Sequence, residues 1–97
     1  MNLALVITPD SIIKQSQGQV STEIDGEVVL MDIEKGTYFG MNLTLSHIWK
    51  LIENPVSVSA ICAKLTEEYD VAPEACMADL LESLGALKKE NLVEVVL

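Results

Sequence analysis

Arginine is absent from this 97-residue sequence, and all six basic residues are lysines. Fifteen acidic residues outweigh them, so the formal net charge is −9. A nucleic-acid duplex repels such a surface, and arginine is the side chain that most often reads guanine and clamps phosphate. These two facts make nucleic acid a poor candidate for a partner.

Histidine, cysteine and long apolar runs are also scarce. One histidine and two cysteines cannot supply the four ligands of a zinc site, so we expect no metal and no cofactor. Apolar runs such as Val28–Met31 fall far short of the roughly 20 residues that span a bilayer. The first residues lack the positive segment of a secretory signal, and two cysteines are too few for a disulfide framework. We expect a cytoplasmic protein with no membrane partner.

The first half of the chain predicts a small antiparallel sheet. The first nineteen residues, interrupted by Pro9 and Gly18, are expected to be irregular, with a short strand left open at Leu3–Ile7. Turn residues at Asp25-Gly26 and around Gly36 separate three β-rich segments. The expected strands are Val20–Ile24, Glu27–Ile33 and Thr37–Met41. They form a meander in which the third strand comes last and lies at an edge.

Helical spacing of apolar residues dominates the second half. The expected helices run from Asn42 or Thr44 to about Asn54, from Ser57 or Ser59 to about Asp70, and from Pro73 to about Glu90. Leu92–Leu97 is expected to be a short apolar strand or tail. The order predicts an α+β fold, winged helix-turn-helix-like, with a three-stranded antiparallel sheet followed by three helices. At about 100–150 residues per domain, the chain is a single domain, 1–97.

The last expected helix is more apolar than one contact requires. At 100° per residue its apolar positions cover about 140° of the circumference, against about 100° for a core-facing stripe. These positions are Cys76, Met77, Leu80, Leu81, Leu84 and Leu87. Gly40, inside the edge strand, favours close approach of another backbone. If strand and helix are adjacent, they form a groove for an extended peptide. The alternative is that this strand edge is already covered. Leu92–Leu97, the opening segment or a second copy in a homodimer could pair with it.

Catalytic chemistry finds little support in the sequence. Cys62 and Cys76 both fall on apolar helix faces, which is typical of structural cysteines. His47 lies among apolar residues of the first helix, where an exposed or hydrogen-bonded side chain is the simplest interpretation. A Cys–His pair stays an alternative, although no third group is placed to orient it. Asp79 lies beside the apolar arc. It either accepts a hydrogen bond from a specific backbone or side-chain donor or is an ordinary surface charge.

Three sequence pieces resemble the PqqD-like family of small precursor-recognition elements. They are Gly-Thr-Tyr-Phe-Gly-Met-Asn at 36–42, Ile-Trp at 48–49 and Asp-Leu-Leu at 79–81, within a resemblance that covers about residues 18–95. It implies a non-catalytic chaperone whose partner is the leader segment of a ribosomally made precursor peptide. It also implies that the leader adds as a strand beside the third strand and lies against the third helix.

Carried over residue by residue, the resemblance implies a two-sided binding site. The implied strand side is Thr37, Tyr38, Phe39, Gly40 and Met41. The implied helix side is Cys76, Leu80, Ser83 and Leu87, with Asp79 alongside. Which edge of the apolar arc faces the peptide stays open.

Two branches of the family supply different enzyme partners. The run from Asp25 to Asn42 looks more like the lasso-peptide branch, which hands its leader to a cysteine protease. The alternative is the pyrroloquinoline quinone branch, whose partner is a radical SAM enzyme. A DNA-binding winged helix is a less favoured reading, since the second and third helices offer only Lys64, Lys88 and Lys89.

Overall fold

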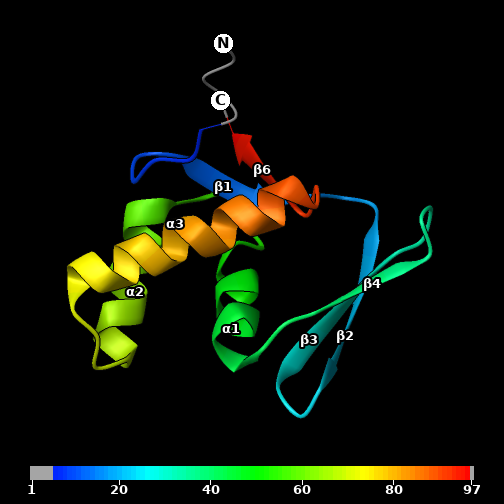
Figure 1. The fold of residues 1–97 in the computed structure, drawn as a ribbon, viewed down its shortest axis with the longest axis horizontal. Helices are drawn as coiled ribbons and strands as arrows, with labels where there is room; N and C mark the ends of the chain where they lie inside the picture. Colours follow the sequence, from blue (N-terminus) through cyan, green and yellow to red (C-terminus); the bar gives the residue numbers. More distant parts are fainter. Residues whose placement is uncertain (1–5, 97) are drawn as a thin grey trace.

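Within residues 6–96, the part of the chain that this computed structural model describes, three helices and six strands form an α+β fold with two small sheets (Figure 1). The strands are β1 (Ile12–Gln15), β2 (Gln19–Ile24), β3 (Glu27–Asp32), β4 (Thr37–Gly40), β5 (Val56–Ser57) and β6 (Val93–Val96). The helices are α1 (Leu43–Leu51), α2 (Val58–Glu68) and α3 (Pro73–Lys89). None of the helices in this range is long and apolar enough to cross a membrane.

The first sheet is the predicted meander, in the order β2-β3-β4, with both pairings antiparallel. Asp25 and Gly26 have φ angles of 53° and 86°, the two positive values that a tight type I′ hairpin turn requires. The register pairs Leu30 of β3 with Phe39 of β4. The prediction that the strand beginning at Thr37 lies at the edge is confirmed.

The second sheet, β5-β1-β6, corrects one expectation and decides one alternative that the sequence left open. The opening segment is not irregular throughout, because β1 pairs with β5 and β6; a strand of four residues is too short for period-two alternation to stand out. The C-terminal strand exists, but Val95 pairs with Ile13 of β1 and β6 leaves β4 uncovered. Of the optional strand Leu3–Ile7, residues 3–5 lie outside the described part and residues 6–7 form no strand.

The three helices begin and end close to the expected residues. The side chain of Asn42 accepts the N–H of Leu45 at 2.9 Å and caps α1, so Asn42 takes this role instead of Thr44. Ser57, not Ser59, caps α2 in the same way. The third helix starts with proline, carries an acidic residue in its first turn and has two lysines in its last, as the helix dipole favours.

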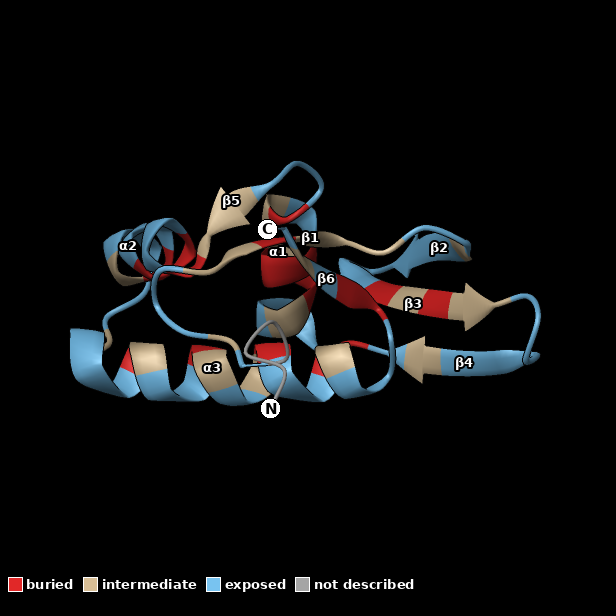
Figure 2. Ribbon diagram, turned by 90° about the horizontal axis from the view of Figure 1, so that it is seen from above, coloured by how far each residue is buried: buried red, intermediate tan, exposed pale blue. Residues whose placement is uncertain are grey.

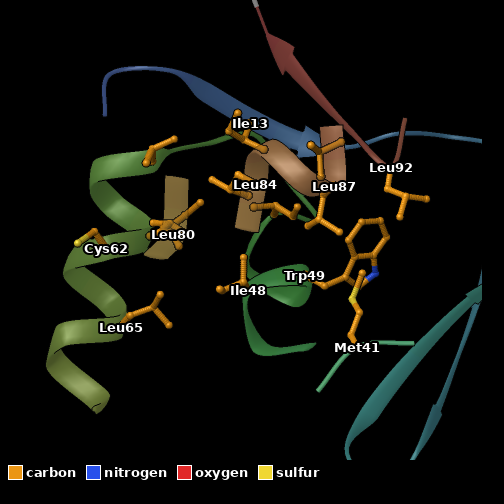
Figure 3. Packing of buried hydrophobic residues seen from close by; sticks show 14 of the residues in the cluster. Ile13, Met41, Ile48, Trp49, Cys62, Leu65, Leu80, Leu84, Leu87 and Leu92 are labelled. Carbon is orange, nitrogen blue, oxygen red and sulfur yellow. The ribbon is translucent and has the colours of Figure 1, made fainter. Parts of the chain in front are cut away.

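One cluster of buried apolar side chains joins the helices to both sheets. Leu80, Leu84 and Leu87 of α3 face α1, which contributes Ile48 and Trp49 (Figure 3). All five side chains are buried. This packing holds α3 across α1, on the same side of the molecule as β4 (Figure 2).

Candidate functional site

The backbone of β4 has one unpaired edge in the described part of the chain. The N–H of Met41 donates to the carbonyl of Val28 at 2.9 Å, which fixes the direction of the alternating ladder between the two strands. Phe39 therefore directs its N–H and C=O toward β3. Tyr38 and Gly40 direct theirs away from the sheet, so four backbone groups can pair with an added strand.

The side chains of β4 alternate between the two faces of the meander. Phe39 is half-buried and packs against the core cluster, whereas Tyr38 is 73% exposed on the opposite face. Thr37 is exposed, and a Cβ added at Gly40 would meet no atom within 4 Å. Nothing in the described part of the chain blocks approach to the Gly40 backbone.

The helix side is a largely apolar cavity of about 250 Å³ between α1, α2 and α3, which we call the helix cavity. The predicted residues Cys76, Asp79, Leu80 and Ser83 line it from α3. Leu80 and Cys76 are buried at its base, Ser83 is half-buried and Asp79 is exposed. This edge of the apolar arc is thus the one that borders an open space shared with α1.

The other edge of the arc points elsewhere. Leu81 borders a separate surface depression with Ile7 of the opening segment. Leu87, with no exposed surface, and Met41, with 3%, lie in the core. Both side chains therefore belong to the core and offer almost no surface to a peptide.

The strand side has its own smaller cavity of about 140 Å³, the strand cavity. It holds Thr37, Tyr38 and Phe39 together with residues from β3, the following turn and the segment after α3. Four of the predicted site residues therefore line the helix cavity and three line the strand cavity, while Gly40, Met41 and Leu87 line neither of the two.

Sequence reasoning missed the residues that α1 and α2 add to the helix cavity. They are Thr44, Ile48, Leu65, Tyr69 and Val71. The helical spacing of Ile48 and Leu65 predicts that they lie in the core, and both are buried there. The same spacing does not indicate that they also border a cavity. Tyr69 and Val71 both follow the end of α2 at Glu68, and two apolar residues so close to the end of the expected helix were the available signal.

The titratable residues near the helix cavity have structural partners. His47 Nδ1 lies 3.3 Å from the hydroxyl oxygen of Tyr69, and its Nε2 lies 3.3 Å from a carboxylate oxygen of Glu68. Burial raises the pKa of the Cys76 thiol, and neighbouring Cys62 and the charge of Asp79 raise it further. A neutral buried thiol is a poor nucleophile. No three potential metal ligands cluster among residues 6–96.

Comparisons with known proteins identify the family of this chain and a similar solved structure. Residues 27–93 match the family described as coenzyme PQQ synthesis protein D (PqqD), and this range contains all ten predicted site residues. The solved structure of TbiB1 in complex with the TbiA(beta) leader peptide is 38% identical, with a TM-score of 0.78. The match covers 84% of this chain and 94% of that one. No curated protein matches the sequence.

Proposed function

The chain belongs to the PqqD family, and we propose that it binds the leader segment of a ribosomally made precursor peptide and presents it to a modifying enzyme. The family consists of non-catalytic binding domains. The observation that carries the proposal is the unpaired edge of β4, in a chain that also has an apolar helix cavity along α3 and is 38% identical to a protein solved with a leader peptide. We take the whole chain, 1–97, as one such binding domain.

The leader would extend the meander as a further strand. Its backbone would pair with the outward N–H and C=O groups of Tyr38 and Gly40. Such pairing is largely independent of sequence, so side-chain contacts must supply the selectivity.

The helix cavity is suited to an apolar side chain of the leader. Its volume of about 250 Å³ accommodates one large aliphatic or aromatic group above Leu80 and Ile48. Asp79 at its rim would favour a cationic neighbour on the peptide, although an exposed pair of this kind adds at most about 1 kcal/mol. Burial of the apolar anchor would provide more, about 1.5–3 kcal/mol.

The favoured enzyme partner is the leader protease of a lasso-peptide pathway, as the Asp25–Asn42 resemblance implies. Delivery to a radical SAM enzyme is the alternative. The genes beside the precursor reading frame distinguish the two partners. Genes for a cysteine protease and an ATP-dependent cyclase would indicate the lasso-peptide pathway, and a gene for a radical enzyme would indicate the alternative.

A DNA-binding function fits the winged helix-turn-helix-like reading of the fold but not the charge. The described ion pairs include Lys64 with Glu68 at 3.6 Å, which lowers the positive charge that α2 could offer to phosphate. Lys88 and Lys89 at the end of α3 remain, on a chain of net charge −9. We therefore do not favour this function.

The proposal is tested by removing one outward donor of β4. Gly40→Pro deletes an N–H that faces away from β3, a substitution that an edge strand tolerates. Ser21→Pro is the matched control, because the same ladder alternation places the Ser21 N–H on the opposite free edge, that of β2.

Titration of the labelled cognate leader should give at least about a ten-fold weaker affinity for Gly40→Pro, since a hydrogen bond is lost and the incoming strand is obstructed. Ser21→Pro should bind like the wild type. Circular dichroism verifies that both variants are folded. Equal affinities of the two folded variants would refute pairing at β4.

A further inference from the structure

The meander has a second face that the core does not use. Alternation along β3 places Val28 and Leu30 toward the core and Val29 and Met31 away from it. The register aligns Val20, Met31 and Tyr38 in one row across the three strands. We call this side, with Val29 and Thr22 in the adjacent row, the outer face.

The outer face is apolar and open. Val20 is 49% exposed and Tyr38 is 73% exposed, and Ile24 and Ile33 at its two ends are each 61% exposed. These four are half of the eight large hydrophobic residues found exposed within residues 6–96. Neither Val29 nor Met31, which are half-buried between the strands, packs against the core cluster. An apolar patch of this kind on a small protein marks an interaction surface.

The charges around the outer face are mostly acidic. Glu27 lies on the face itself, Asp25 lies in the turn at one end, and Glu34 lies in the turn at the other end beside Lys35. None of these four joins an ion pair in the described part of the chain. A second copy would bring the same acidic rim against its own, on a chain already at −9, whereas a basic rim would complement it.

We propose that the outer face docks the enzyme that modifies the precursor, through an apolar patch edged by lysine and arginine. This inference rests on the proposed function, because a leader strand paired with β4 belongs to the same sheet and extends this face by one strand. The enzyme then contacts Tyr38 and the outward side chains of the leader together. Leader and enzyme accordingly bind with positive coupling, each raising the affinity for the other by the same factor.

The test uses the purified chain, the synthetic leader and the purified leader protease of the same pathway. Val20→Glu places a charge in the apolar row, at its β2 end, and Glu27→Lys reverses the rim charge. Glu67→Lys makes the same reversal on the exposed surface of α2 and is the matched control. Thr22→Glu, at an exposed polar position of the outer face, repeats the test if Val20→Glu does not fold.

Protease affinity should fall about ten-fold or more in Val20→Glu and Glu27→Lys and stay unchanged in Glu67→Lys. Leader affinity, measured without protease, should be the same in all variants, and it reports the proposed function separately. Wild-type protease affinity in both outer-face variants overturns the inference. So does an equal loss of leader affinity, which would place the outer face in the leader site, or loss of self-association alone, which would identify a second copy as the occupant.

Discussion

The hydroxyl of Ser46 in α1 accepts the N–H of Val28 in β3 at 2.8 Å and donates to the carbonyl of Met41 at 3.3 Å. Ser46 is 1% exposed, so this contact is sheltered from water. It fastens α1 to the strand that pairs with β4 and to the residue that follows β4. The Ser46 contact therefore fixes the position of α1, which lines the helix cavity, relative to the free edge of β4.

Ser46→Ala should lower the free energy of unfolding by about 1–3 kcal/mol, because the buried N–H of Val28 loses its acceptor. Urea denaturation followed by circular dichroism measures this change. Ser59→Ala removes a hydroxyl that donates to Pro9 in an exposed setting and should cost less than about 1 kcal/mol. Equal losses in the two variants would show that the Ser46 contact has no special weight.

Filling the helix cavity should weaken leader binding without unfolding the protein. Leu80 is unsuitable for this purpose, since it is 2% exposed and a polar substitution there would disrupt the core. Ser83→Tyr, at the half-buried edge of the cavity, should reduce leader affinity about ten-fold by occupying the anchor position. Glu82→Tyr, one residue away on the exposed surface of α3, is the control and should bind normally.

The raised pKa of Cys76 predicts a loss of stability at alkaline pH. The folded chain holds the thiol proton to a higher pH than the unfolded chain does. Stability is therefore fully present below the unfolded pKa of about 8.5 and decreases as the pH rises through the folded value. Cys76→Ala should show a smaller decrease in melting temperature above about pH 8.5 than the wild type. Parallel curves for the two proteins would contradict the assignment.

Local signals determined which elements could be predicted. Asp25-Gly26 is a residue pair that favours the two positive φ angles of a tight turn, so the hairpin could be predicted from the sequence. The edge position of β4 could be predicted from the order of the strands. The β5-β1-β6 sheet joins segments from both ends and the middle of the chain, and pairing over such distances leaves no local pattern. For the same reason the sequence left open whether the C-terminal strand covers β4.

The site was predictable only in outline. An apolar arc on α3 indicates surplus contact area, but helical spacing does not tell which members face the core. The structure assigns Leu84 and Leu87 to the core, while Cys76 and Leu80 also border the helix cavity. That division depends on how α1 and α2 are placed, which is a tertiary property.

Leader affinity should depend only weakly on salt. Backbone pairing and apolar burial dominate the proposed complex, and screening acts mainly on exposed pairs such as one involving Asp79. Between about 50 and about 200 mM salt the dissociation constant should change less than about three-fold, against 10³–10⁵ for a protein with many phosphate contacts. A mobility-shift assay with random duplex DNA should show no complex at about 150 mM salt. Tight, steeply salt-dependent DNA binding would contradict the leader-binding proposal.

The most specific prediction concerns single amides of β4. In the free protein the N–H of Phe39 is already bonded to β3, whereas those of Tyr38 and Gly40 point outward. Binding of the leader should therefore slow hydrogen exchange at Tyr38 and Gly40 and change Phe39 far less. Amide-resolved exchange measured by NMR, with and without leader, gives the comparison. The buried amide of Trp49 is the internal control and should be unchanged. Uniform protection of all β4 amides would point to a general stiffening of the meander, and protection confined to α3 would place the leader away from the strand edge.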